Sequence, residues 1–303
     1  MEKRNHGLKK LKLLGLALFI FILCFTGFLS SPALTAETKI KGYLFIIGGG
    51  DRPDSMMERF IDLASKSGNG RIVILTMASA TPEETGTAMV EEFKRLGAKE
   101  AVYYNFTRQQ AEQYPNARLL AESGGIFFSG GVQTRITEAI LDTPIHNMIK
   151  QLYAQGAVIG GTSAGAAVMS ELMITGDEVR KVEEGHEFEI IQAGNVVLAR
   201  GLGLIKKAII DQHFATRKRH NRLISVIAEH PDLLGIGIDE STAIIVYPDE
   251  TFEVIGNKNV IVYDASKAKI TFGPRREVGI QGMIMDILLP GEKFSLTKKK
   301  EIK

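Results

Sequence analysis

Short apolar runs alternate along most of the chain with segments of helical periodicity. Runs rich in Val, Ile, Phe and Tyr predict strands over residues 43–47, 72–75, 101–104, 125–128, 156–159 and 208–210. Apolar positions that recur every three or four residues predict helices over 55–65, 83–96, 134–141 and 145–155. This alternation indicates βαβ units and an α/β fold with a mostly parallel sheet covered on both faces.

The pattern changes after residue 234. Short strands with hairpin-like turns are predicted over 235–238, 243–247, 251–255 and 260–263, and we expect them to close one edge of the sheet as antiparallel strands. Residues 37–295 are therefore expected to form a single α/β domain. The basic tail, 296–303, is predicted to be disordered.

The N-terminal segment has the pattern of a signal peptide. An almost wholly apolar stretch over 13–29 follows five basic residues, Lys3, Arg4, Lys9, Lys10 and Lys12. Small residues then precede a predicted cleavage site after Ala36. The alternative is an uncleaved membrane anchor, because the stretch approaches the length that spans a bilayer. With cleavage, we expect a periplasmic or secreted protein with no stable membrane association.

Removal of residues 1–36 would change the cysteine content and the net charge of the chain. Cys24 is the only cysteine, so the mature chain would have no disulfide and no thiolate ligand. The segment carries five basic residues and one acidic residue, so its loss changes the net charge from +2 to −2. This charge argues against a nucleic-acid partner. The histidines are scattered and no H-E-x-x-H motif occurs, so neither a metal nor a cofactor is predicted.

The stretch Gly160-Gly161-Thr162-Ser163-Ala164-Gly165 lies where a predicted strand gives way to a predicted helix over 164–173. A sharp turn of this kind lifts the Ser163 hydroxyl clear of the backbone, as in a nucleophile elbow. The N–H of Ala164 would then face a developing oxyanion. The alternative is a glycine-rich turn without chemistry.

A serine nucleophile needs a base and a group that orients the base. His213 is the histidine that directly follows a predicted strand, which makes it the strongest candidate by position. Asp239 and Glu240 follow the strand over 235–238, and either carboxylate could orient the imidazole. Asp211 is too close to His213 in the sequence for that role.

Other polar or glycine-rich segments also follow predicted strands. The pair Gly130-Gly131 could supply an oxyanion N–H, with Gln133 facing the same cleft, or could be a plain turn. A basic run over 217–222 could form a carboxylate-binding pocket or a solvated face. Gly48-Gly49-Gly50 matches no nucleotide-binding motif and is predicted to be a tight turn near the site.

Together these segments resemble the cyanophycinases, which share a serine peptidase family with aspartyl dipeptidase (peptidase E). The resemblance rests on residues 127–133, 160–169, 211–222 and 237–243, which occur in the family order. The pattern D-Q-H-F-x-x-R-x-R-x-x-R, beginning at Asp211, is its most specific part. The loop over 48–53 and Val132, where the family often has aspartate, depart from the pattern.

The resemblance implies a three-layer α/β/α fold like that of class I glutamine amidotransferase domains, often assembled as a homodimer. It implies Ser163 as nucleophile, His213 as general base, Glu240 as orienting carboxylate, and Gly131 and Ala164 as oxyanion donors. The substrate pocket would be shaped by Gln133, Asp211, Gln212, Arg217, Arg219 and Arg222. Exopeptidase cleavage of cyanophycin to β-Asp-Arg is the implied activity. An aspartyl or isoaspartyl dipeptidase and a catalytically silent acidic-peptide-binding protein are the alternatives.

Overall fold

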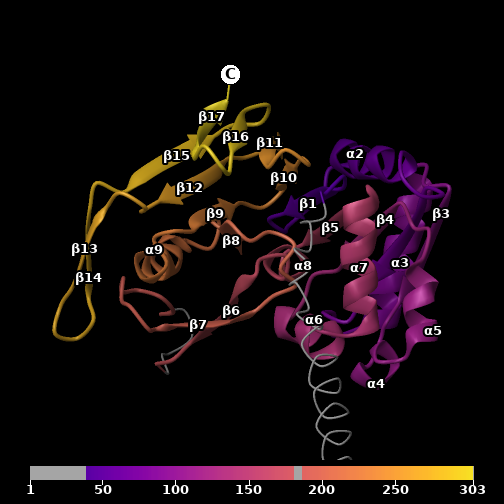
Figure 1. Ribbon diagram of the computed structural model, residues 1–303, viewed down its shortest axis with the longest axis horizontal. Helices are drawn as coiled ribbons and strands as arrows, with labels where there is room; N and C mark the ends of the chain where they lie inside the picture. The colour runs from indigo at the N-terminus through magenta and orange to yellow at the C-terminus, as the bar shows by residue number, and fades with distance from the viewer. Residues whose placement is uncertain (1–38, 181–185, 303) are drawn as a thin grey trace, which may run out of the picture. The chain divides into compact units, whose positions relative to one another are not determined.

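The computed structural model describes residues 39–180 and 186–302, which are built around a nine-stranded sheet (Figure 1). Five adjacent strands are parallel, in the order β1 (Tyr43–Ile47), β5 (Val158–Thr162), β4 (Gly125–Phe128), β2 (Arg71–Leu75) and β3 (Glu100–Tyr104). The first four of these strands are buried almost throughout. They are continuous apolar runs rather than alternating ones, because both of their faces are covered.

Helices cover both faces of the parallel strands. On β1, Phe45 and Ile47 belong to the core beneath α2 (Asp54–Ser65) and α3 (Pro82–Arg95). Leu44 and Ile46 belong to the opposite core, beneath α6 (Gln133–Ile140) and α7 (Pro144–Gln155). The short helices α4 (Arg108–Ala111), α5 (Tyr114–Ala117) and η1 (Arg118–Leu120) connect β3 to β4. The predicted three-layer α/β/α fold is confirmed.

Antiparallel strands extend the sheet beyond β1, as predicted. They follow in the order β10 (Thr242–Val246), β11 (Thr251–Gly256), β16 (Lys293–Ser295) and β17 (Lys300–Ile302). The tail predicted to be disordered instead supplies β17, and Leu296 is buried in the core. The basic composition of this segment hid an edge strand, in which Lys300 is exposed.

A second sheet was not predicted. Its strands lie in the order β15 (Ile284–Leu288), β12 (Val260–Asp264), β9 (Leu234–Ile238) and β8 (Ala208–Gln212), with α9 (His220–Glu229) packed against it. The predicted strands over 208–210, 235–238 and 260–263 therefore belong to this sheet and not to the main one. Two hairpins complete the described fold, β6 (Leu172–Glu178) with β7 (Val196–Arg200) and β13 (Lys269–Phe272) with β14 (Val278–Gln281).

The helix predicted over 164–173 is also shorter than expected. The helix α8 covers only Ala164–Ala167, and β6 begins five residues later. The carbonyls of Val168 and Met169 accept hydrogen bonds from the chain at Leu202 and Leu204. These tertiary bonds use the carbonyls that a longer helix would have needed.

The predicted signal peptide, its cleavage site after Ala36 and Cys24 lie outside the described residues. Within the described ranges, no helix is long and apolar enough to cross a membrane.

Candidate active site

Three side chains from distant parts of the sequence form one hydrogen-bonded series. Nε2 of His213 lies 2.9 Å from Oγ of Ser163, and Nδ1 of the same ring lies 2.6 Å from Oε1 of Glu240. Ser163 follows β5, His213 follows β8 and Glu240 follows β9, so all three stand at the carboxyl ends of strands. The residues predicted as nucleophile, base and orienting carboxylate are thus brought together.

The backbone at Ser163 has the geometry of a sharp elbow. Its φ of 54° and ψ of −108° place a residue with a side chain in a region that favours glycine. The flanking glycines make this turn possible, since a Cβ at Gly161 would lie 2.9 Å from Cα of Gly165. A Cβ at Gly165 would in turn lie 2.7 Å from Cβ of Phe128. The elbow therefore requires Gly161 for the close approach of α8 (Ala164–Ala167) and Gly165 for the packing of this helix against β4.

The partners of His213 fix its tautomer. The carboxylate of Glu240 can only accept, so Nδ1 carries the proton and Nε2 accepts from the Ser163 hydroxyl. Burial lowers the pKa of His213 below its ordinary value of 6.5. The hydrogen bond to Glu240 raises this pKa, whereas the charges of Arg217 and Arg219 lower it. At neutral pH the ring is therefore neutral and able to take a proton.

Asp239, the other carboxylate considered for this role, faces away from the imidazole. Its Oδ1 accepts from the backbone N–H of Thr216 at 2.9 Å, and its Oδ2 lies 3.2 Å from Nζ of Lys258. These contacts keep the pKa of Asp239 below its ordinary value, although burial opposes them. Asp239 therefore holds the loop after β8, and Glu240 is the carboxylate that contacts His213.

Gln212 and Arg219 lie beside the serine. Nη1 of Arg219 donates to the backbone carbonyl of Gln212 at 2.7 Å and to its Oε1 at 2.8 Å. The same Oε1 is 3.5 Å from Oγ of Ser163, whereas Nε2 of His213 is 2.9 Å from it. The imidazole nitrogen is therefore the better acceptor for the serine hydroxyl. Burial lowers the pKa of Arg219 to about 10. Both residues adjoin the site, as predicted, and Arg217 is exposed next to them.

Asp211 and Arg222 do not line an open pocket. Nε of Arg222 donates to Oδ2 of Asp211 at 2.7 Å, and Nη2 of Arg222 donates to Oδ1. Asp211 is 1% exposed and Arg222 is 2% exposed, and the guanidinium also stacks 5.3 Å from the ring of Phe188. Their predicted place in the substrate pocket is corrected, because the two charges neutralise each other inside the protein.

Gln133 is also occupied by the protein itself. Its Nε2 donates to the carbonyls of Ile174 at 2.9 Å and Thr175 at 2.6 Å, which ties the start of α6 to β6. The side chain was predicted to face the cleft and shape the substrate pocket. Its amide instead links α6 to β6.

The predicted oxyanion donors, Gly131 and Ala164, have backbone N–H groups that are available to a substrate. Within the described residues, the N–H groups of Gly131 and Ala164 donate no hydrogen bond. Gly131 has a φ of +134°, and a Cβ there would overlap the carbonyl oxygen of Ala78. A Cβ at Gly130 would lie 3.6 Å from Cβ of Ser163, so the loop after β4 adjoins the serine. Position 131 therefore requires glycine, whereas a Cβ at position 130 would make only an ordinary contact with the serine.

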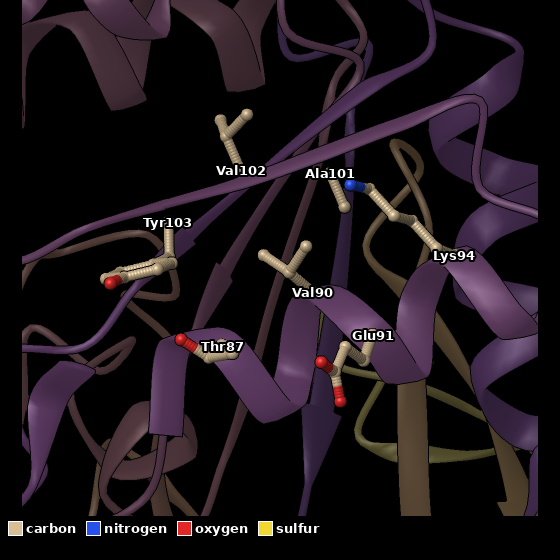
Figure 2. Close-up of a pocket in the computed structure, with 7 residues that line it drawn as sticks. All are labelled: Thr87, Val90, Glu91, Lys94, Ala101, Val102 and Tyr103. Carbon is tan, nitrogen blue, oxygen red and sulfur yellow. The ribbon is translucent and has the colours of Figure 1, made fainter. Parts of the chain in front are cut away.

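A separate depression of about 430 Å³ lies on another part of the surface (Figure 2). Its lining residues come from α3 and the edge strand β3: Thr87, Val90, Glu91, Lys94, Ala101, Val102 and Tyr103. Because β4 and β2 separate β3 from β5, the depression does not adjoin Ser163. In the described part of the chain, no three or more His, Cys, Asp or Glu side chains are grouped so that they could hold a metal ion.

Comparison with known proteins gives the class of this protein. Residues 44–255 match the model of peptidase family S51. The chain belongs to this family and is a serine-type peptidase.

Two relatives and one solved structure are similar to this chain over most of its length. The chain is 33% identical over 267 residues to the cyanophycinase of Trichormus variabilis, which covers 86% of this chain and 87% of the relative. It is 35% identical over 237 residues to the cyanophycinase of Geminocystis herdmanii, covering 77% and 84% of the two chains. The crystal structure of a peptidase from an acI-B1 Actinobacterium aligns with a TM-score of 0.63 over 86% of this chain and 98% of that one. At 20% identity, that structure shows the shared fold alone.

Proposed function

We propose that this protein is an exported serine exopeptidase that hydrolyses cyanophycin to β-Asp-Arg dipeptides through an acyl-enzyme at Ser163. The observation that carries the proposal is the position of the His213 imidazole, bonded to the hydroxyl of Ser163 on one side and to the carboxylate of Glu240 on the other. This is the arrangement that turns a serine hydroxyl into a nucleophile near neutral pH.

In the first half of the reaction, Oγ of Ser163 attacks the carbonyl carbon of the scissile peptide bond and its proton passes to Nε2 of His213. The imidazolium gives this proton to the leaving nitrogen, the C–N bond breaks, and an ester to Ser163 remains. Water then attacks the ester while His213 accepts a proton from the water. The same proton returns to Oγ of Ser163 as the acyl product leaves with a free carboxylate. Glu240 stabilises the imidazolium in both halves.

The negative charge that develops on the carbonyl oxygen needs hydrogen-bond donors. The N–H groups of Gly131 and Ala164 are the donors we propose, since one lies in the loop after β4 and the other directly follows the nucleophile. Donors fixed in the backbone need no reorganisation when the charge appears, which is why they lower the barrier effectively.

The substrate class is supported by the relatives that are named cyanophycinases and by the basic loop beside the site. Cyanophycin carries an arginine on every aspartate side chain, and each of these arginines ends in a carboxylate. Arg217 is exposed and close enough to His213 to influence its pKa, so its guanidinium can meet such a carboxylate near the reacting bond. The half-buried Arg219, bonded to Gln212, adds positive charge beside the site.

The test of the substrate is a comparison of cyanophycin with a panel of α- and β-aspartyl dipeptides. Faster release of β-Asp-Arg from the polymer than cleavage of any dipeptide is the expected result. Cleavage of dipeptides alone would identify an aspartyl or isoaspartyl dipeptidase. Absence of all cleavage, together with no fluorophosphonate labelling of Ser163, would leave a binding protein.

Export is proposed from the predicted signal peptide. Expression of the full chain in a Gram-negative host, followed by fractionation and N-terminal sequencing, should give a periplasmic or secreted protein that begins at Glu37. Recovery of the uncleaved chain in the membrane fraction would instead indicate an anchor. The homodimer expected from the family resemblance stays a prediction, to be measured on the processed form.

A further inference from the structure

The end of β1 contacts the backbone of all three segments that carry the proposed catalytic side chains. Three consecutive carbonyls accept one N–H from each segment: Ile47 from Ser163 at 3.0 Å, Gly48 from His213 at 2.7 Å, and Gly49 from Ser241 at 2.9 Å. Ser241 directly follows Glu240. One short piece of backbone therefore touches the nucleophile, the base and the neighbour of the orienting carboxylate.

The three donors share an unusual conformation. Ser163, His213 and Ser241 have φ values of 54°, 48° and 55°, all in the left-handed region that residues with side chains avoid. Such a conformation persists only where the surrounding structure holds it in place. The successive carbonyls of residues 47–49 supply that restraint at each of the three positions.

The two glycines at this loop also contact the side chains of the site. Gly49 has a φ of +106°, and a Cβ there would overlap Cε1 and Nε2 of His213, the edge of the ring that faces Ser163. Gly50 has a φ of +68°, and a Cβ there would lie 2.8 Å from Cβ of Glu240. Any larger residue at Gly49 must displace the imidazole.

We propose that Gly49 and Gly50 are positioning residues that hold Ser163, His213 and Glu240 in register, an inference that rests on the proposed function. Gly49 acts on the base and Gly50 on the orienting carboxylate. Neither glycine takes part in bond making, and both act by leaving the imidazole and the carboxylate where the carbonyls of residues 47–49 hold their segments. The loop that begins at Gly48 was predicted as a tight turn near the site, and we infer that it also fixes the positions of the catalytic side chains.

The test is the rate at which a fluorophosphonate labels Ser163, because this reaction needs the base but not the natural substrate. In Gly49→Ala the imidazole moves away from the hydroxyl, and we expect a loss of about 100-fold in the labelling rate constant. The rise of the parent's rate through the pKa of His213 should be lost as well. Gly50→Ala should lose less, about tenfold, since its Cβ would meet Cβ of Glu240 at 2.8 Å and not the ring of His213.

Two glycines elsewhere provide matched controls for backbone strain. Gly97 has a φ of +95° and Gly203 a φ of +64°, and a Cβ at either position would meet nothing within 4 Å. Gly97→Ala therefore matches Gly49→Ala, and Gly203→Ala matches Gly50→Ala. Both controls should lose stability and keep the parent's labelling rate and pH profile, with the final labelled fraction reporting the amount of folded enzyme.

The outcomes separate the two claims. Labelling of Gly49→Ala and Gly50→Ala at the rate and with the pH profile of their controls would overturn the positioning role while leaving the proposed function intact. If Gly49→Ala does not fold, the comparison of Gly50→Ala with Gly203→Ala decides the question. A parent that is not labelled, beside a known serine hydrolase that is, would refute the proposed function, and the positioning role would fall with it.

Discussion

Oε1 of Glu240 lies 2.6 Å from Nδ1 of His213 and faces the side of the ring opposite Ser163. The adjacent carboxylate, Asp239, points the other way and pairs with Lys258. Two neighbouring carboxylates after one strand therefore have different roles. Glu240 orients the imidazole, and Asp239 holds the loop that follows β8. This division is set by the direction of each side chain, which the sequence alone leaves open.

Replacement of these two carboxylates should separate their tasks. Glu240→Gln keeps the size of the side chain but removes the charge that orients the ring and stabilises the imidazolium, so kcat should fall by about 10²- to 10⁴-fold. Asp239→Asn should change kcat far less and lower Tm instead. Steady-state kinetics and thermal unfolding of both variants make the comparison. The reverse pattern would mean that Asp239 orients the base.

Burial lowers the pKa of His213 most, and the charge of Arg217 should shift the acid limb of the activity further in the same direction. Its guanidinium lowers the pKa of His213, so in Arg217→Gln this pKa should rise toward its ordinary value of 6.5. The base would then become protonated at a higher pH, and the acid limb of Ser163 labelling by a fluorophosphonate should move to higher pH. Lys218→Gln, an exposed change in the same loop, is the control. An unchanged limb in Arg217→Gln would exclude this influence on His213.

The buried pair of Asp211 and Arg222 should affect stability before it affects substrate binding. Arg222→Met leaves the carboxylate of Asp211 buried without its paired charge, and we expect a loss of about 3–5 kcal/mol in the free energy of unfolding. The double variant Asp211→Asn, Arg222→Met should recover part of that loss. Urea denaturation measures both. If Arg222→Met keeps its stability and has a raised KM, Arg222 contributes to substrate binding after all.

Acid should destabilise the fold through a second histidine. His146 is 1% exposed, accepts at Nδ1 from the N–H of Asp142 at 3.1 Å and donates from Nε2 to the carbonyl of Leu202 at 2.8 Å. Burial lowers the pKa of His146 below 6.5. The unfolded chain then binds more protons than the folded one as the pH falls below 6.5, so stability is lost from there down through the lowered pKa.

The measurement for His146 is the free energy of unfolding in urea at pH 7.5 and at pH 5.5. His146→Gln should be less stable than the parent at pH 7.5 but should lose less stability between the two values. Part of the loss should remain, because the pKa of His213 is lowered in the same direction. An equal loss in parent and variant would show that His146 does not contribute.

The main sheet was predictable because its strands are uninterrupted apolar runs. The strands at Tyr43–Ile47 and Gly125–Phe128 have the bounds that the sequence predicts, and the helix at Pro144–Gln155 differs by one residue. The second sheet could not be predicted, since β8 and β9 show the same apolar character as strands of the main sheet. Which sheet a strand joins depends on long-range pairing and not on its own pattern.

The candidate site was predictable as far as residue type and position after a strand allow. Ser163, His213 and Glu240 each follow a strand and are brought together. Asp211 in β8, Arg222 in α9 and Gln133 at the start of α6 were also predicted to shape the pocket, yet they bond within the protein. Their residue types do not reveal these internal partners. The role of Gly49 went unpredicted because a glycine has no side chain to suggest a contact, and only the approach of His213 reveals it.

Digestion of cyanophycin by the protein beginning at Glu37, with Ser163→Ala alongside and the products identified by mass spectrometry, tests the proposed function most directly. We predict release of β-Asp-Arg by the parent and a rate lower by at least about 10⁴-fold in the variant. An intact polymer after treatment with a parent whose Ser163 reacts with a fluorophosphonate would contradict the substrate. Equal digestion by both proteins would contradict Ser163 as the nucleophile.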